Sequence, residues 1–572
     1  MDDKNARVCP LQPNMFFCFR TSCLPPRTNR WAKSLLADPS KIADDSYYDD
    51  AVDNYLRRSA ELRRRFDRDY GDVVVFGEGD CGQLGCGEAV TESRVPRILL
   101  GLRGSKIDMI ACGGLHSLAL MKDGSVHSWG CNDEGSLGWR TSDEEGGNNG
   151  YMPCRVLGFV PSEYGPNGST ADLMEEDGST VVPYARRREA VITQVAAGET
   201  QSVALSSAGD VYVWGTYKDN EGRKFRGVPP PDDRRTPTGY KDMTNLEEDE
   251  DPQWYHPPRG NQDWPCHVVD MPGRVKDVSA GGASNAALME DDTIVTWGLG
   301  LCGELARPVP VIDKKTSDDV VIRDYLTPKP PVWDGPTMKR AVVTMSCGGF
   351  HLLVVTREGG GNLEVYSSGV NNYGQLGHGD TKGREILTRI QSLSGRHIAK
   401  VEGGMHFSFF LDKTSKELYA CGRGDYGSLG ITLEQPDPGY LESLPVRVPL
   451  VHEPDARAIS DRNMNRKENC IIVEDIVEAD QPEIEQISCG STHVLVLTKA
   501  GDAYSWGFGQ CGACGQGKSD QDVLRPTRLV PRLASKDGGG GAMSAACKIQ
   551  YVSGGGQHSA AIVKTGSTGF AS

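Results

Sequence analysis

The chain has 572 residues, of which 38% are hydrophobic and 24% charged, and its formal net charge is −16 at pH 7. This composition supplies enough apolar material for a core and excludes wholesale disorder. The acidic balance also excludes a body that binds nucleic acid by general attraction to phosphate, because that attraction needs clustered Lys and Arg.

The cysteine and glycine counts narrow the class further. Seventeen cysteines are scattered along the chain without a secretory leader, so we expect reduced thiols, no disulfide framework, and neither secretion nor a membrane span. The 69 glycines lack a collagen period and therefore indicate many tight turns between short strands.

Residues 1–70 precede the repeats described next and are expected to form a partly disordered tail. A basic cluster occupies its second half, with Tyr55, Leu62 and Phe66 at helical spacing. The cluster consists of Arg57, Arg58, Arg63, Arg64, Arg65 and Arg68. It predicts either a nuclear-import or DNA-touching arm or a short surface helix.

From Phe76 onward one glycine-rich motif recurs seven times. A residue that is usually aromatic or small is followed by Gly and then by a second glycine step that commonly ends in Leu-Gly, as in FGEGDCGQLG. The copies start at Phe76, Trp129, Trp214, Trp297, Ser368, Cys421 and Trp506. A unit of about 50 residues with insertions on some turns is typical of a propeller blade.

A second motif, of the type GGLHSLAL, precedes every copy except the first, and its last occurrence, ending at Val563, has no partner after it. The two terminal fragments therefore complete each other. We predict an all-β, seven-bladed propeller over residues 71–566, closed by pairing of the N-terminal strand with the C-terminal blade and followed by a short tail at 567–572.

Two motifs in the repeat resemble cofactor signatures. GxGxxG occurs four times in phase with the β-repeat, whereas a dinucleotide site needs one copy between a strand and a helix, so these are turn glycines. Cys511 and Cys514 form CxxC, but Cys514 stands where other copies have Leu, which indicates a small buried side chain. We therefore expect no cofactor and no metal.

Histidine recurs at what we interpret as one repeat column, with Gln201 and Ser284 in two of the copies. The histidines are His116, His351, His406, His493 and His558. Each side chain could be structural and bond to backbone in the turn above its strand. Alternatively, because strand ends cluster around one face of a propeller, the column could form a ring of contacts on a partner.

The third blade departs from its own repeat. Gly130 and Gly135 of the second copy are five positions apart, whereas Gly215 and Gly222 of the third are seven apart. The loop WGTYKDNEG is thus expected to project further than its equivalents. It is either a tolerated surface insertion or a functional element.

In these motifs and their circular offset, the chain resembles the regulator of chromosome condensation family from about Val73 to Lys564. The resemblance implies a guanine nucleotide exchange factor that promotes GDP release and GTP loading on the small GTPase Ran without covalent chemistry. It further implies a nuclear, chromatin-associated monomer that supports nucleocytoplasmic transport and assembly of the spindle and nuclear envelope. The same propeller also serves scaffolds and receptors, so a non-catalytic interaction propeller is the alternative.

The resemblance also assigns residues. The β-wedge that such factors press against the nucleotide site corresponds here to Tyr217, Lys218, Asp219, Asn220, Glu221 and Gly222. The remaining Ran-binding face corresponds to Asp80, His116, Glu199, Arg307, His406 and His558. One departure is Ala283, which stands where the family has an aspartate implicated in nucleotide release.

Four insertions, at 139–190, 223–270, 308–340 and 431–486, are polar and in part rich in Pro, and are expected to be surface loops. The third follows Arg307, where the family has a loop that reaches the nucleosome. It offers Lys314, Lys315 and Arg323 as histone or DNA contacts, with solvated loop cations as the alternative.

Overall fold

A computed structural model describes fourteen stretches of the chain. They are residues 71–139, 141, 149–159, 190–218, 224–225, 262–268, 270–309, 324–335, 340–359, 361–432, 434–450, 481–517, 520–529 and 548–564. The chain divides into two units, Met1–Arg68 and Asp69–Ser572. The basic cluster of the predicted tail lies outside the described residues.

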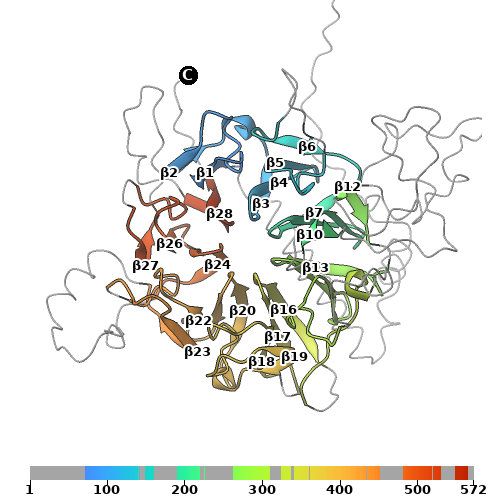
Figure 1. Cartoon of the computed structure of the whole chain (residues 1–572), viewed down its shortest axis with the longest axis vertical. Helices are drawn as coiled ribbons and strands as arrows, with labels where there is room; N and C mark the ends of the chain where they lie inside the picture. Colours follow the sequence, from blue (N-terminus) through green and yellow to red (C-terminus); the bar gives the residue numbers. More distant parts are fainter. Residues whose placement is uncertain are drawn as a thin grey trace, which may run out of the picture. The chain divides into compact units, whose positions relative to one another are not determined.

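Seven antiparallel sheets stand around a central channel, and each forms one blade of a propeller (Figure 1). Among the described residues, six blades have four strands and one has three. This confirms the predicted all-β, seven-bladed fold.

The first blade in the ring is closed by both ends of the chain and contains β1 (Asp72–Glu78), β2 (Glu92–Ile98), β28 (Lys548–Gly554) and β29 (His558–Lys564). The next two contain β3 (Ile107–Cys112), β4 (His116–Met121), β5 (Val126–Gly130) and β6 (Cys154–Val156), then β7 (Ile192–Ala197), β8 (Gln201–Ser206), β9 (Val211–Gly215) and β12 (Gln262–His267). The three-stranded blade contains β13 (Val275–Ala280), β14 (Ser284–Met289) and β15 (Ile294–Gly298).

The last three blades contain β16 (Ala341–Cys347), β17 (His351–Arg357), β18 (Leu363–Gly369) and β19 (Arg384–Arg389), then β20 (Ile398–Gly403), β21 (Phe407–Asp412), β22 (Leu418–Arg423) and β23 (Leu441–Val448), then β24 (Ile484–Cys489), β25 (His493–Thr498), β26 (Ala503–Gly507) and β27 (Val523–Arg528). A separate hairpin pairs β10 (Tyr217–Lys218) with β11 (Lys224–Phe225), and short 3-10 turns occupy Leu100–Leu102 and Gln391–Leu393.

The ring closes as the unmatched terminal motifs predicted. Strand β1 pairs antiparallel with β29, with Val73 opposite Ile562 and Val75 opposite Ala560. The first strand of the propeller therefore lies inside the sheet of this closing blade, between β2 and β29. Because each end of the chain supplies part of one sheet, no open sheet edge is left between the first and last repeats.

The outer strands correct the interpretation of the insertions as loops. The insertions 139–190, 223–270 and 431–486 contain the fourth strand of a blade, namely β6, β12 and β23. The insertion 308–340 contributes an isolated β-bridge between Thr296 and Lys329. Sequences such as QDWPCH and LESLPVRV carry Pro and charges without clear alternation, which an edge strand tolerates because one side faces solvent. Alternation alone could not detect them.

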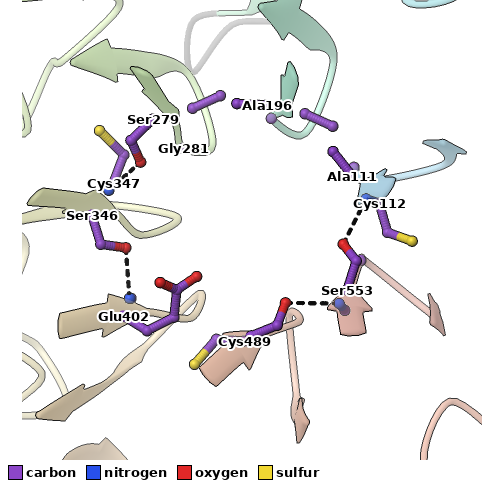
Figure 2. A pocket seen from close by; sticks show the side chains of 18 of the residues that line it. Ala111, Cys112, Ala196, Ser279, Gly281, Ser346, Cys347, Glu402, Cys489 and Ser553 are labelled. Carbon is purple, nitrogen blue, oxygen red and sulfur yellow. Dashed lines mark hydrogen bonds between the residues drawn. The ribbon is translucent and has the colours of Figure 1, made fainter. Parts of the chain in front are cut away.

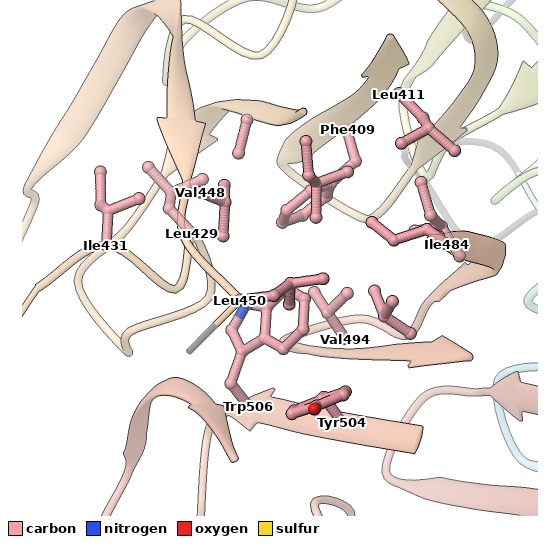
Figure 3. Packing of buried hydrophobic residues seen from close by; sticks show 14 of the residues in the cluster. Phe409, Leu411, Leu429, Ile431, Val448, Leu450, Ile484, Val494, Tyr504 and Trp506 are labelled. Carbon is pink, nitrogen blue, oxygen red and sulfur yellow. The ribbon is translucent and has the colours of Figure 1, made fainter. Parts of the chain in front are cut away.

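Apolar side chains fill the spaces between neighbouring blades. In Figure 3 the Trp506 ring of one blade lies among Phe409, Leu429 and Leu450 of the preceding blade. Phe409 and Trp506 meet edge to face, with ring centroids 5.8 Å apart. The core thus consists of blade-to-blade layers, and the stability of each blade depends on its neighbours.

We predict that closure of the ring is needed for stability. Val75 of β1 is fully buried in the layer that joins the closing blade to the next one. Replacing it with Asp would bury an unpaired charge and lower the free energy of unfolding by about 3 to 5 kcal/mol, measured by urea denaturation.

The matched control is Val191→Asp, because Val191 is half exposed. A shift within about 0.5 kcal/mol is expected there. Equal destabilisation by the two substitutions would contradict the role given to β1.

Candidate functional site

In each four-stranded blade, two loops lie at the same face of the propeller. Because consecutive strands are antiparallel, the turn between the first and second strands and the loop between the third and fourth strands emerge at the same end. We call this the loop face. It carries the exposed side chains of Asp80 and Glu199 and the base of the third-blade loop.

At five blade junctions among the described residues, a backbone carbonyl in the loop after the third strand of one blade accepts hydrogen bonds from the next blade. The Ser136 carbonyl accepts hydrogen bonds from Ser202 Oγ at 2.9 Å and from Trp214 Nε1 at 2.8 Å, both on the next blade. We call this arrangement the carbonyl clamp. It explains the recurring Leu-Gly end of the motif, since the glycine that follows at Gly138 has a φ of +73° and would collide with Trp214 if it carried a Cβ.

The loop carbonyl is again an acceptor at four further junctions among the described residues, with two donors at two of them and a single donor at the other two. The acceptors are the carbonyls of Gln83 (from Ser117 and Trp129), Gln375 (from Ser408 and Cys421), Ser428 (from Trp506) and Ala513 (from Ser559). The loop motif is therefore a device for joining blades and not a phosphate-binding turn.

Four histidines extend the clamp. His116 Nε2 lies 2.9 Å from Ser202 Oγ, and His558 Nε2 lies 2.8 Å from Ser117 Oγ. Each serine donates its single proton to the clamp carbonyl, so the histidine must donate through Nε2 and Nδ1 must be unprotonated. His351 and His493 make the same contacts, with Ser408 and Ser559.

His116 and His558 are therefore structural, but they contact serine side chains of the next blade and not the backbone of the turn, as the structural alternative had it. Both side chains are buried, with exposed fractions of 1% and 0%. The prediction that these two side chains contact a partner is corrected, because their ring nitrogens face the interior between blades. Burial lowers the pKa of His116 to about 4 and that of His558 to about 3, so the neutral form predominates.

The assignment of His406 to the same column was wrong by one position. The turn amide of Gly404 bonds to the Phe407 carbonyl, just as Gly113 bonds to His116, so Phe407 is the column residue in that blade. His406 precedes it and is only half buried on the loop face. An aromatic side chain replaced histidine in the column, and the adjacent histidine concealed the replacement.

Arg307 also belongs to the interior. Its Nη1 lies 3.2 Å from Asp324 Oδ2, and its Nη2 donates to the Asp324 carbonyl at 2.9 Å. Only 6% of the side chain is exposed. The predicted partner contact is corrected, because the guanidinium holds Asp324, in the part of the third insertion that leads back to the propeller. Lys314, Lys315 and Arg323 of that insertion lie outside the described residues.

At the third blade an anchored hairpin replaces the clamp. Tyr217 on β10 is fully buried among Leu299, Leu305 and Tyr325. Its hydroxyl bonds to the side-chain amide of Asn285 on the next blade. Tyr217 is thus an anchor, and its assignment to the surface of the wedge is corrected. Ala283 packs against the same apolar cluster.

The base of this hairpin is fixed to the preceding blade by charge. Lys218 and Lys224, which face each other across β10 and β11, both form ion pairs with Glu134, the second with an Nζ–Oε2 distance of 3.2 Å. Thr216 Oγ1 adds a bond to the Glu134 carbonyl at 2.8 Å. Asp219, Asn220, Glu221 and Gly222 lie outside the described residues.

The two predicted acidic residues are placed where a partner could reach them. Asp80 and Glu199 are exposed on the loop face, in the closing blade and the third blade. Glu199 lies at the mouth of the channel, where neighbouring protein raises the pKa of its carboxyl and the positive charge of Lys218 partly offsets that effect.

The loop face also carries an aromatic row that was not predicted. His406 stacks on Phe350, with centroids 5.3 Å apart, and contacts Tyr373 at 4.9 Å. Arg423 lies over Tyr373 and Tyr426, with its fork held by Asp425 at 2.8 and 2.9 Å. The signal was present as an aromatic residue before the second glycine in NNYG and GDYG, but spacing alone does not show that these rings meet.

The comparison with family models covers most of the propeller. The model described as RCC1-like domain matches residues 72–561. The chain belongs to the RCC1-like domain family. This membership confirms the suspected resemblance and accounts for the seven-bladed architecture.

Relatives of this RCC1-like chain carry different names at similar identity. They include the regulator of chromosome condensation of Homo sapiens, 26% identical over 86% of this chain and 91% of the relative. The guanine nucleotide exchange factor SRM1 of Saccharomyces cerevisiae is 27% identical, with 80% and 82% covered. The ultraviolet-B receptor UVR8 of Arabidopsis thaliana is 26% identical, with 82% and 80% covered.

Solved structures share the fold of the RCC1-like chain. Yeast RCC1 (Prp20) bound to Kap60 superposes with a TM-score of 0.61 at 25% identity, covering 87% of this chain and 90% of that one. A second structure of Prp20p from Saccharomyces cerevisiae gives a TM-score of 0.61 at 24% identity, covering 88% and 93%.

The cofactor-like motifs of this RCC1-like chain are structural. Cys514 is buried and its thiol pKa is raised by burial, as expected for a small core side chain. Among the described residues, no group of three or more His, Cys, Asp or Glu side chains is arranged to hold a metal ion. Nor does any helix in the described stretches have the length and apolarity to cross a bilayer.

The histidine clamps predict a specific pH dependence of stability. Burial lowers the pKa of His493 from 6.5 to about 4. Between these two pH values the unfolded chain binds a proton at His493 and the folded chain does not. The stabilising contribution of His493 is therefore fully present above about pH 6.5 and is lost as the pH falls toward 4. In urea denaturation, the stability advantage of wild type over His493→Gln should shrink by on the order of 2 kcal/mol between pH 7 and 4.5.

Glutamine is the natural substitute in this column, since Gln201 donates to the Gly281 carbonyl of the next blade at 2.9 Å. The matched control is His397→Gln, which makes the same substitution at an exposed position. If the free energy of unfolding differed between wild type and His493→Gln by the same amount at every pH, the folded protein would not hold His493 in its neutral form.

Proposed function

We propose that this protein is a guanine nucleotide exchange factor for the small GTPase Ran. The observation that carries the proposal is the anchored base of the third-blade hairpin, which takes the place of the carbonyl clamp and whose two strands flank the predicted wedge residues 219–222 in the sequence. The names of the regulator of chromosome condensation and of SRM1 among its relatives support it.

The hairpin is suited to deform a partner because its base is rigid. Tyr217 fixes it to the following blade, and Glu134 fixes both of its lysines to the preceding blade. A hairpin base held in this way loses little conformational entropy on binding, so more of the contact energy is available to displace a phosphate-binding loop of the partner.

Exchange then follows from linkage and requires no bond to be made or broken. If the protein binds nucleotide-free Ran more tightly than loaded Ran, nucleotide affinity must fall by the same factor. The wedge residues that could reach the partner are Lys218, Asp219, Asn220, Glu221 and Gly222. Asp80 and Glu199 would compete for basic groups of the GTPase and disturb its magnesium site, and the acidic balance of the chain would steer encounter.

The proposed Ran-binding face accordingly contains fewer of the residues that the sequence predicted. It retains Asp80, Glu199 and the half-buried His406, and it gains the aromatic row around Arg423. Aromatic and arginine side chains supply a large share of binding energy in interfaces. We place the protein in the nucleus on chromatin as a monomer, with Lys314, Lys315 and Arg323 as candidate contacts to histones or DNA.

A non-catalytic scaffold is the second candidate, and two observations favour it. A light receptor is among the relatives at similar identity, and Ala283 gives the fourth blade an apolar side chain packed against the Tyr217 cluster in place of a carboxylate. The two candidates make opposite predictions for nucleotide release.

We predict that replacing 219–222 with Gly and Ser lowers the rate at which the protein releases labelled GDP from Ran by about 10- to 100-fold. Tyr217 is left intact because its loss would disturb the blade junction. The measurement is fluorescence of a labelled GDP on purified Ran.

The control replaces 413–416, a turn of equal length on the opposite face between β21 and β22, and should leave the rate unchanged. If the wild-type protein fails to accelerate release, the scaffold is the correct assignment. If it accelerates release and the 219–222 variant does so equally well, exchange does not depend on the hairpin.

A further inference from the structure

The anchor of the third-blade hairpin lies in an apolar cluster that a second, distant segment completes. Tyr217 packs there with leucines of the fourth blade. The cluster also contains Tyr325 and Leu326, which have exposed fractions of 1% and 0%. These two residues belong to 324–335, which we call the return strap because it leads from the third insertion back to the propeller. The packing around the hairpin anchor therefore depends on where the return strap lies.

Arg307 fixes the start of the return strap. Its guanidinium bonds to the side chain and to the backbone carbonyl of Asp324, at 3.2 and 2.9 Å. Both bonds end on the residue immediately before Tyr325. Because they hold the carboxylate and the backbone of Asp324 together, they orient the peptide unit that carries the Tyr325 ring.

The repeat does not require an arginine at this position. In the loops that carry a clamp, the residue three positions after the clamp carbonyl has no fixed charge. Three of these residues contact a serine hydroxyl in the third strand of their own blade, namely Trp139 with Ser128, His378 with Ser367 and Gln516 with Ser505. The fourth blade keeps a hydroxyl at the same place, since Thr296 Oγ1 donates to the Leu305 carbonyl at 2.7 Å. Arg307 instead bonds to Asp324 on the return strap.

Arg307 also brings a cost that a neutral residue avoids. Its charged side chain is only 6% exposed, and its Nε has no hydrogen-bond partner among the described residues. Burial of this kind gives little net stability, because the loss of hydration offsets the attraction between the two charges. What distinguishes Arg307 from its neutral equivalents is therefore the fixed position of the return strap.

The junction between the third and fourth blades relies on the hairpin anchor more than other junctions would. At the wall of the central channel, serines of four blades accept an amide from the next blade (Figure 2). The third blade has Ala196 at this level and has no hydroxyl to form that bond. Gln194 bonds to the Val278 backbone at 3.0 Å, on the side away from the loop face. At the loop face, the bond between Tyr217 and Asn285 takes the place of the clamp.

We propose that Arg307 is a positioning residue for the third-blade hairpin. Through Asp324 it holds Tyr325 against Tyr217, so the base of the hairpin keeps one position at the loop face. The inference rests on the proposed exchange function for its effect on nucleotide release. The contact between the return strap and the hairpin can be tested on the chain alone.

A positioning role and a contact role for Arg307 predict different kinetics of GDP release from Ran. If the side chain contacted Ran, its loss would mainly raise the Ran concentration needed for half-maximal release. If it acts through Tyr217, the Arg307→Gln variant should have a maximal rate lowered by about 5- to 20-fold, with the half-saturating concentration changed by less than about threefold.

The test that needs no partner is amide hydrogen exchange of β10 and β11 in the full chain, followed by mass spectrometry. In Arg307→Gln, exchange of this hairpin should be at least about 10-fold faster than in wild type, because its anchor is no longer held. The matched control is Arg389→Gln, which breaks a partly buried ion pair with Glu364 in a blade that contributes no residue to the Tyr217 cluster. Hairpin exchange in the control should stay within about twofold of wild type.

A double-mutant cycle tests the order of the contacts. Tyr325→Leu removes the ring that Arg307 is inferred to hold and should also accelerate exchange of the hairpin. Adding Arg307→Gln to Tyr325→Leu should change the exchange rate by less than about twofold more, because both substitutions act through one contact. Effects that multiply independently would show that Arg307 does not act through Tyr325 and would overturn the proposal.

Melting temperatures establish that each variant folds. Should Arg307→Gln not fold, Arg307→Lys keeps the charge without the two-pronged guanidinium and should give a smaller change in the same direction. Unchanged hairpin exchange in a folded variant would contradict the positioning role. Faster hairpin exchange in a chain whose wild type does not release GDP from Ran would support the positioning role and reject the proposed exchange function, so the two failures are distinguishable.

Discussion

The structure depends on one repeated interaction, in which the backbone carbonyl of a loop accepts one or two hydrogen bonds from the next blade, given by a serine hydroxyl, a tryptophan indole or a cysteine thiol. Blades of a propeller share apolar layers, and apolar contact alone is not directional. The clamp supplies direction, because each donor must reach one oxygen between fixed strands. At four junctions a buried neutral histidine contacts the serine, and the stability of these junctions therefore depends on pH.

The third blade shows what happens when a loop is released from that duty. Here the Tyr217 hydroxyl meets Asn285 of the next blade, and no loop carbonyl among the described residues of this blade accepts from that blade. The junction is therefore kept by a side chain. Tyr217 both anchors the base of the hairpin and braces two blades, so the stability of the junction and the position of the hairpin base depend on the same residue.

The architecture was predictable because glycine spacing and the unmatched terminal motifs depend only on local chain geometry. Site residues were less predictable, since burial is decided by neighbours distant in sequence. The sequence does not show that Arg307 is held by Asp324, which lies 17 residues away and makes Arg307 an interior residue. Nor does it show that Phe407, and not the adjacent His406, is the column residue, because only the hydrogen bond from the Gly404 amide fixes the register of that turn. The outer strands were hidden by Pro and charge, which obscure the alternation expected of a strand.

The central claim is that the hairpin favours a GTPase from which nucleotide has been removed. The direct measurement is the equilibrium affinity of the full chain for nucleotide-free Ran compared with GDP-loaded Ran, by surface-immobilised binding at one salt concentration. The account predicts at least 100-fold tighter binding to the nucleotide-free form. Equal affinity for the two forms would contradict it, because a partner that does not discriminate between them cannot shift nucleotide binding.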